Sequence, residues 1–337
     1  MFQRGGLKLA FDAGSGTLLV VDDAGWEALA DLLGRIGSRP AGEPQGADAQ
    51  PGREGHARGE RRREARQELD ELVRRGLLLS RVAVPARPRP VLKALCLHVA
   101  HACQMRCAYC FARGGDYGGG AELMPSRVAR AAVDLLLDPS SGARRWAIDF
   151  FGGEPLLNWP VVVDTILYAR EKADCLGGQV RFTLTTNALE LSPERLGFLD
   201  EHGVDLVVSL DGRPEVHDDV RRLADQSPTW ERALEGALRA ASSRGTLSGG
   251  TGGATLWVRG TFTRRNLDFA RDAIFLFDLG FDRVSLEPVC GGPPDLAVGP
   301  RDLPVLAEQY GTLALWCGER ARMGRPVHFY HFELDPD

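Results

Sequence analysis

The sequence predicts an α/β fold in which a parallel sheet follows a small α+β domain. From residue 93 onward, short apolar strands alternate with helical stretches, which is typical of βα units around a parallel sheet. Residues 1–80 instead combine a hairpin pattern with amphipathic helices, and a proline-rich stretch over 81–92 predicts a stiff linker. A chain of 337 residues is long enough for two such domains.

The first domain is expected to begin with a β-hairpin. Residues 7–12 and 17–21 are largely apolar, and the glycines of the intervening Ala13-Gly14-Ser15-Gly16 turn permit positive φ angles. A helix should follow, with Asp22 or Asp23 as its cap. Its apolar residues recur at helical spacing: Trp26, Leu29, Ala30, Leu32 and Leu33.

The remainder of this domain divides into a loop, a helix and a short strand. Residues 37–61 are rich in Gly, Ala, Pro, Gln and charged residues, so we expect a disordered loop that buries too little apolar surface to order. Helical spacing returns over residues 65–73 and ends near Gly76. The apolar run Leu77-Leu78-Leu79 then predicts a short strand.

The second domain, over residues 93–325, is expected to contain six βα repeats. The predicted strands cover residues 94–99, 147–151, 181–186, 206–210, 256–263 and 283–288. The predicted helices lie near residues 125–137, 160–175, 193–202, 228–243, 266–279 and 301–322. Six units are too few for a closed eight-stranded barrel, so a partial barrel and an open doubly wound sheet remain as alternatives.

Composition excludes several classes of protein. The chain carries 41 Lys and Arg against 46 Asp and Glu, a net charge of -5, so it has no overall basic field for nucleic acid. No apolar run approaches the roughly 18 residues that span a bilayer, and no signal-peptide core follows the first residues. Three of the seven cysteines lie close together, which suits ligation in the reducing cytoplasm better than disulfides.

The cysteine cluster is the strongest chemical signal. Cys103, Cys107 and Cys110 follow the first predicted strand with C-x3-C-x2-C spacing, which suits three corners of an iron-sulfur cubane and leaves one iron open. The alternative is a zinc site completed by His98 or His101. Structural zinc sites usually add a second, distant pair of ligands, and the sequence has no such pair.

Glycine-rich and polar residues follow the next three strands. Residues 150–155 read Phe-Phe-Gly-Gly-Glu-Pro, 185–187 read Thr-Thr-Asn, and 209–212 read Ser-Leu-Asp-Gly. Each stretch by itself also suits a turn or a helix cap. Because the carboxyl ends of parallel strands meet at one edge of a sheet, we expect them to share a site.

Together, the order and position of these motifs resemble the radical S-adenosylmethionine (SAM) enzymes. The resemblance implies a partial (β/α)6 barrel with one [4Fe-4S] cluster on Cys103, Cys107 and Cys110. It also implies that the open iron chelates SAM. One electron would then cleave SAM to a 5'-deoxyadenosyl radical that abstracts hydrogen from the substrate.

The same resemblance implies which residues contact SAM, although it names no catalytic residue. Tyr109 would pack near the adenine, Gly153 and Glu154 would meet the methionine amino group, Ser209 would bond the ribose or methionine, and Arg221 would pair with the carboxylate. Without the resemblance, Arg221 suits a solvated arginine on a helix surface equally well. The implied cofactor contacts are Tyr109, Gly152, Gly153, Glu154, Asn187, Ser209 and Arg221.

A narrower resemblance, to the maturases of SCIFF peptides, extends over almost the whole chain. These enzymes form thioether bridges between cysteine sulfurs and acceptor-residue carbons of a ribosomally made, cysteine-rich precursor. The resemblance implies that residues 1–80 are a winged-helix-like module whose sheet edge binds the leader of the precursor. It also implies an electron donor such as flavodoxin or ferredoxin. The phrases that carry it are residues 98–101, 111–116, 149–156, 258–263 and 285–289.

Departures from that family leave other functions open. A cysteine-rich SPASM domain with auxiliary iron-sulfur clusters is expected after the barrel, and residues 326–337 would be its start; Cys290 and Cys317 alone cannot ligate a cubane. Gln104-Met105 and Ala188 are mild departures that keep the ligands. The alternatives are another peptide-oxidising radical enzyme of the sulfatase-maturating type and a catalytically incomplete peptide-binding protein.

Overall fold

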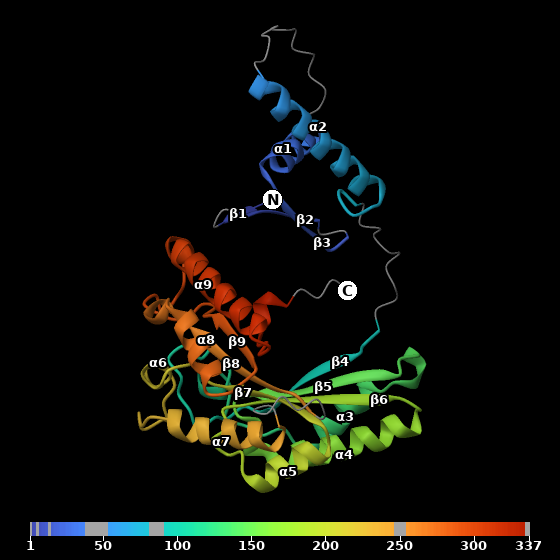
Figure 1. The fold of residues 1–337 in the computed structure, drawn as a ribbon. Coiled ribbons are helices and arrows are strands. Elements are labelled where there is room, and N and C mark those ends of the chain that lie inside the picture. The colour runs from blue at the N-terminus through green and yellow to red at the C-terminus, as the bar shows by residue number, and fades with distance from the viewer. Residues whose placement is uncertain are drawn as a thin grey trace. The chain divides into compact units, whose positions relative to one another are not determined.

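The computed structural model describes residues 2–4, 7–12, 15–37, 53–80, 91–245 and 254–333 (Figure 1). Contacts divide the chain into two compact units, one centred on residues 1–89 and one spanning Pro90–Leu334. Each unit is described by itself below. No helix in the described ranges is long and apolar enough to cross a membrane.

The first unit is an antiparallel sheet with two helices. Its elements are β1 (Phe2–Arg4), β2 (Leu7–Asp12), β3 (Thr17–Val21), α1 (Asp23–Gly37) and α2 (Arg53–Arg74), with the strands in the order β1-β2-β3. The predicted hairpin is confirmed by the pairing of β2 with β3, whereas β1 was not predicted. Its small core consists of Ala10, Ala28, Leu29, Leu69 and Leu78.

The expected loop over 37–61 is wrong in its second part. Helix α2 begins at Arg53, although Gly55 and Gly59 lower its helix propensity. Arginine, glutamate and alanine are good helix formers, and the segment continues directly into the apolar face that packs at Leu69. The first part of the predicted loop, residues 38–52, lies outside the described residues.

The predicted strand at Leu77-Leu78-Leu79 is also wrong. These residues form bends, and Leu79 has a φ of 52°. The hairpin turn holds them through side chains instead, because the Ser15 hydroxyl donates to the Leu77 carbonyl at 3.0 Å. The Ser80 hydroxyl likewise donates to Asp12 at 2.5 Å. Burial of Leu78 therefore requires no ladder of backbone hydrogen bonds.

The second unit is built on a parallel sheet, as predicted. Its strands run in the order β10-β9-β8-β7-β6-β5-β4, and every pair of neighbours is parallel. This order follows the chain without reversing, which is the order of a partial barrel and not of a doubly wound sheet. The strands are β4 (Ala94–Ala100), β5 (Arg145–Gly152), β6 (Gln179–Thr186), β7 (Val204–Ser209), β8 (Leu256–Phe262), β9 (Arg283–Pro288) and β10 (His328–Phe329).

Strand β10 extends the unit past the boundary expected at residue 325. His328 and Phe329 pair with the start of β9, and Phe329 is buried in the core. Two residues are too few to produce a visible sequence pattern, so the strand was not predicted. Residues 326–333 are therefore part of this sheet and its flanking turn.

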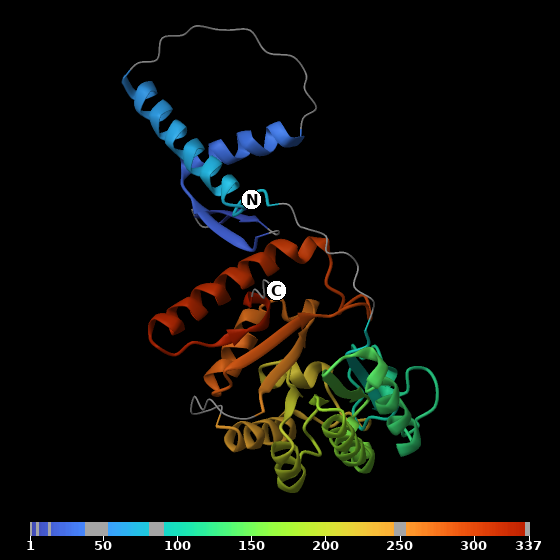
Figure 2. The same cartoon turned by 90° about the vertical axis from the view of Figure 1, so that its right-hand side faces the viewer.

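Helices pack along one side of the curved sheet (Figure 2). They are α3 (Ser126–Leu136), α4 (Trp159–Cys175), α5 (Pro193–Glu201), α6 (Pro214–Val220), α7 (Trp230–Ser243), α8 (Phe269–Asp278) and α9 (Leu303–Arg322). Along β7, Val204, Leu206 and Val208 are buried, and the alternate residues are only partly buried. The strands thus turn one face to the helices and leave the other face only partly buried.

Candidate active site

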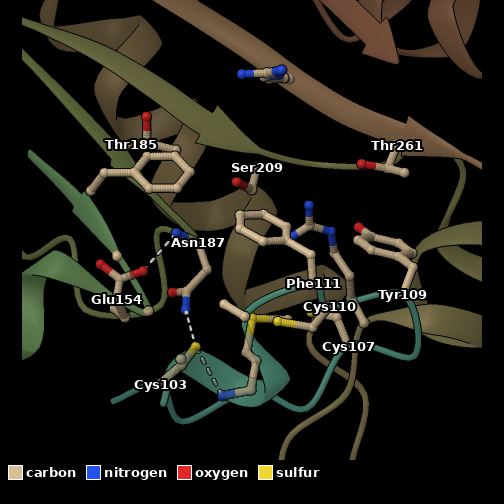
Figure 3. Close-up of a pocket in the computed structure, with 18 of the residues that line it drawn as sticks. Cys103, Cys107, Tyr109, Cys110, Phe111, Glu154, Thr185, Asn187, Ser209 and Thr261 are labelled. Carbon is tan, nitrogen blue, oxygen red and sulfur yellow. Dashed lines mark hydrogen bonds between the residues drawn. The ribbon is translucent and has the colours of Figure 1, made fainter. Parts of the chain in front are cut away.

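A pocket of about 400 Å³ lies at the carboxyl ends of the strands of the second unit (Figure 3). Every residue that the sequence analysis assigned to the cluster or to the cofactor lines this pocket. These residues are Cys103, Cys107, Tyr109, Cys110, Gly152, Gly153, Glu154, Asn187, Ser209 and Arg221. The structure therefore brings together motifs that lie far apart in the sequence.

Two groups of residues in the pocket lining are important for the site. The cysteine wall comprises the loop 103–110, residues 152–154 and Asn187. The β8–β9 wall comprises Arg259, Thr261 and Glu287. Figure 3 shows Thr261 across the pocket from Cys103.

Donor groups surround the thiols of the cysteine wall. The backbone N–H of Met105 donates to Sγ of Cys103 at 3.4 Å, and that of Gly114 donates to Sγ of Cys110 at 3.3 Å. The side-chain amide of Asn187 lies 3.8 Å from Sγ of Cys103. Hydrogen bonds to sulfur stabilise thiolate ligands and tune the potential of a bound cluster.

Burial makes these thiols reluctant to ionise on their own. Desolvation raises the pKa of Cys103 to about 11 and that of Cys107 to about 12, and the nearby charge of Arg221 opposes both shifts. The free thiols of Cys103 and Cys107 therefore stay protonated at neutral pH. Cluster assembly has to release these protons, so it is favoured at higher pH.

The zinc alternative finds no support in the described residues. Their Cys, His, Asp and Glu side chains form no group of three able to hold a metal ion. His98 stacks on Tyr117, with ring centroids 5.0 Å apart, and His101 contacts the same ring. A cubane accepts one thiolate at each of several irons, which spreads the sulfurs more widely than a single tetrahedral ion does.

The glycines of the cysteine wall are required by close backbone packing. A Cβ atom on Gly153 would lie 2.2 Å from the carbonyl oxygen of Ala102, just before the cysteine loop. Gly152 has a φ of 121°, and its Cβ would lie 2.5 Å from the Ala100 carbonyl oxygen. The N–H of Glu154 donates to the same Ala102 carbonyl at 2.8 Å, so the glutamate is fixed directly against the loop.

Glu154 is an almost fully buried carboxylate, 1% exposed. It accepts hydrogen bonds from the Thr186 hydroxyl at 2.7 Å, the Asn187 N–H at 2.8 Å and the Leu156 N–H at 3.1 Å. Burial raises the pKa of Glu154 to about 7, although these donors act in the opposite direction. A bound ammonium group would restore the ionised form and use the remaining acceptor capacity.

Tyr109 and Arg221 meet at a second buried carboxylate, Asp211. The Tyr109 hydroxyl donates to Oδ2 of Asp211 at 2.6 Å, and Nε of Arg221 lies 3.0 Å from the same oxygen. The N–H of Thr261 donates to Oδ1 at 2.9 Å. Burial raises the pKa of Tyr109 well above its usual value, so the phenol stays neutral.

Arg221 is not a solvated surface arginine, because its side chain is only 11% exposed. Its Nε lies 3.0 Å from Oδ2 of Asp211, so this nitrogen is paired with that carboxylate. The guanidinium lines the pocket and carries further N–H donors, which suit a carboxylate ligand.

The sequence analysis did not assign Arg259, Thr261 or Glu287 to the site. Arg259 and Thr261 alternate along β8 on one face, and Glu287 follows on β9 opposite Thr261. The alternation along a strand that was correctly predicted is a signal that could have identified them. Cys290, just beyond β9, also lines the pocket.

The model of the Radical SAM superfamily matches residues 97–254. Among curated proteins, the uncharacterised protein MJ0907 of Methanocaldococcus jannaschii is 27% identical over 146 residues, covering 43% of this chain and 47% of that protein. The radical SAM cyclopropyl synthase TigE of Paramaledivibacter caminithermalis is 24% identical over 137 residues, covering 37% of this chain and 28% of that protein. The chain thus spans less than half the length of either relative.

Solved structures share the fold. Native anSMEcpe with bound AdoMet superposes with a TM-score of 0.62 at 17% identity, covering 72% of this chain and 64% of that one. The same protein with bound AdoMet and Kp18Cys peptide gives the same score and coverage. These matches agree with the parallel α/β sheet described above.

Proposed function

From a chain whose residues 97–254 match the model of the Radical SAM superfamily, we infer a radical SAM peptide maturase that forms thioether cross-links in a SCIFF precursor peptide. The observation that carries the proposal is the pocket, where all residues implied for the cluster and for SAM lie together. The product would join a cysteine sulfur to a carbon of an acceptor residue.

The residues present fit an iron-sulfur cluster. Cys103, Cys107 and Cys110 would hold it, with N–H donors already directed at two of the sulfurs. When bound, the cluster supplies the electron that cleaves SAM reductively. Met105 within the same loop is buried and lines this part of the pocket.

The cofactor contacts follow from charge and hydrogen-bonding capacity. Glu154 would accept from the amino group of SAM, and Arg221 would donate to its carboxylate. Tyr109 would present its ring to the adenine while its hydroxyl stays on Asp211. Ser209 and Asn187 would supply further polar contacts from the ends of β7 and β6.

The first unit would bind the leader of the precursor at the edge of its sheet. Strand β3 pairs with β2 alone among the described strands, so its other edge can accept an extended peptide. Phe11, Leu18 and Val20 are 45%, 48% and 69% exposed, which leaves apolar side chains on one face of this hairpin for contact with the peptide. Main-chain bonds would give affinity, and these side chains would give specificity.

The proposed activity requires a reducing compartment and an electron donor. We expect it to work in the cytoplasm, where flavodoxin or ferredoxin would reduce the cluster. Auxiliary clusters are expected from the family resemblance, although Cys290 and Cys317 alone cannot ligate a cubane.

The test is a reaction with a cysteine-rich precursor peptide that carries its leader. We expect each cross-link to remove two hydrogens from the product and to protect one cysteine from iodoacetamide. Tandem mass spectrometry should place the sulfur on an acceptor carbon. A product with all thiols still open to alkylation would contradict thioether formation.

A second candidate, oxidation of a peptide residue to an aldehyde, is favoured by one observation. The fold is similar to that of anSMEcpe, which was solved with bound AdoMet and Kp18Cys peptide. An aldehyde product reacts with a hydrazide reagent, whereas a thioether does not. The same product mixture therefore separates the two functions.

A further inference from the structure

Glu287 projects into the pocket from the end of β9 and is held by groups outside the cysteine wall. The Ser285 hydroxyl donates to its Oε1 at 2.7 Å, and Nε2 of His331 lies 2.8 Å from its Oε2. Nδ1 of His331 in turn lies 2.7 Å from the Tyr310 hydroxyl. Ser285 of β9 and His331 of the turn after β10 thus converge on one carboxylate, and Tyr310 of α9 lies behind His331.

The chemistry of the partners fixes the direction of these bonds. An ionised carboxylate only accepts, so Nε2 of His331 must carry a proton. In the neutral imidazole, Nδ1 then accepts from the Tyr310 hydroxyl. The rings of Phe329 and Tyr310 contact the imidazole, with centroids 5.5 and 5.7 Å away, and keep it in place.

This support keeps Glu287 ionised. Burial alone would raise the pKa of its carboxyl, but the hydrogen bonds from Ser285 and His331 and the charge of Arg259 lower it below the usual value. An ionised carboxylate with a low pKa is a weak base. Glu287 is therefore better suited to recognising a hydrogen-bond donor than to removing a proton.

Arg259 supplies the complementary charge on the neighbouring strand. Ser285 lies opposite Arg259 and Glu287 opposite Thr261, so Arg259 and Glu287 are diagonal neighbours on one face. The structure shows no ion pair between them in its described part, and both line the pocket. The Arg259 guanidinium, a donor, and the Glu287 carboxylate, an acceptor, are therefore separated by a gap.

The other acidic groups of the pocket have less free capacity. Glu154 accepts three hydrogen bonds and is 1% exposed, and Asp211 is held by Tyr109, Thr261 and Arg221. Glu287 accepts two, and about 26% of its side chain is exposed. It is thus the carboxylate with room for a ligand.

We propose that Glu287 and Arg259 form a subsite for one peptide unit of the substrate. Glu287 would accept from the backbone N–H, and Arg259 would donate to the C=O. The N–H and C=O of a trans peptide point in opposite directions, which suits two groups separated by a gap. A cationic side chain fits less well, because Arg259 would repel it. Ser285, His331 and Tyr310 are positioning residues.

This inference rests on the proposed function in one respect, that the substrate is a peptide. It assigns recognition to the backbone, so the subsite would tolerate different side chains at this position of the substrate. The β8–β9 wall would then determine which peptide unit faces the cofactor, and the cysteine wall would supply the chemistry.

The experiment measures binding of a fluorescein-labelled, cysteine-rich precursor peptide to the reconstituted enzyme with SAM, by anisotropy under anaerobic conditions. Glu287→Gln should weaken binding about 10- to 100-fold, as expected for a lost hydrogen bond to a charged group. Glu333→Gln is the matched control, because Glu333 pairs with His328 outside the pocket. Iron content and SAM affinity should not change in either variant.

Amide-to-ester substitution along the peptide tests the backbone assignment. One ester, which lacks the N–H donor, should weaken binding to the unmodified enzyme about as much as Glu287→Gln does. The same ester should have no further effect on Glu287→Gln. Additive losses at every position, or loss of SAM affinity in Glu287→Gln, would overturn the proposal.

The positioning residues have a separate readout. Peptide affinity should fall as the pH drops and Glu287 takes up a proton. His331→Gln and Tyr310→Phe should move this acidic limb to higher pH, because the hydrogen bond to Glu287 is lost or weakened and the pKa of Glu287 rises. An unshifted limb would contradict their role. Binding that depends on Glu287 without any thioether product would leave this subsite standing and reject the proposed function.

Discussion

The cysteine wall and the β8–β9 wall face the same pocket but are built differently. The cysteine wall depends on local motifs, in which glycines let backbones approach and backbone N–H groups meet sulfur or carboxylate. The β8–β9 wall depends on side chains, and Glu287 is held by His331 and Tyr310 from distant parts of the chain. The cysteine wall is thus encoded in local sequence motifs, whereas the β8–β9 wall depends on tertiary structure.

The largest expected effect compares Cys107 of the cysteine wall with Cys290, which lines the pocket just beyond β9. Cys107→Ala should reduce the iron content from about four per reconstituted chain to near none, because the cluster loses a ligand. Cys290→Ala is the control, since Cys290 lines the pocket beyond β9 and is outside the loop. Iron analysis after anaerobic reconstitution measures both. Equal iron in the two variants would contradict the ligand assignment.

The next effect tests the backbone packing of the cysteine wall. Gly153→Ala should lower the free energy of unfolding by about 3 kcal/mol or more, because its Cβ would lie 2.2 Å from the Ala102 carbonyl oxygen. Gly197→Ala in α5 is the matched control, with no atom within 4 Å of its added Cβ. Gly197→Ala should change the free energy of unfolding by less than about 1 kcal/mol, in the stabilising direction. Urea unfolding of both variants distinguishes the outcomes.

The pH dependence of stability tests the burial of Glu154. Its pKa rises from 4.5 to about 7 in the folded chain, so the unfolded chain loses this proton first as pH increases. The free energy of unfolding should therefore fall between pH 4.5 and 7, by at most about 3 kcal/mol from this group. Glu154→Gln should remove that part of the slope. Identical slopes in both proteins would show that the carboxyl is not buried as described.

The smallest effect compares two tyrosine–aspartate hydrogen bonds. Tyr109→Phe should cost about 2 kcal/mol, because it removes a buried bond to the charged Asp211. Tyr168→Phe removes a bond of similar length to Asp134 at an exposed position, so we expect little change. Thermal unfolding of the two variants gives the difference directly. A loss of the same size at both positions would argue against a special role for burial.

Much of the second unit could be predicted from the sequence because its strands are buried on one face and follow helices in regular alternation. All six predicted strands are confirmed, and β9 (Arg283–Pro288) begins and ends at the predicted residues. The consecutive strand order was not predictable, since periodicity does not report which strands pair. Helix α6 and strand β10 were missed because each is too short to show a period.

The cysteine wall was predictable for a related reason. Its glycines, thiols and Glu154 lie in short runs directly after strands, and parallel strands bring such runs together. The salt bridge of Arg221 to Asp211 was not predicted, because each residue alone also suits a turn or a helix end. His331 and Tyr310 show no motif, and only the folded chain places them behind Glu287.

The most direct test of the account is SAM cleavage by the reconstituted chain. The protein is loaded anaerobically with iron and sulfide, then given SAM and dithionite, and iron and 5'-deoxyadenosine are quantified. We expect about four irons per chain and formation of 5'-deoxyadenosine. Failure to hold iron, or a full cluster without any 5'-deoxyadenosine, would contradict the proposal that this pocket binds a cluster and cleaves SAM.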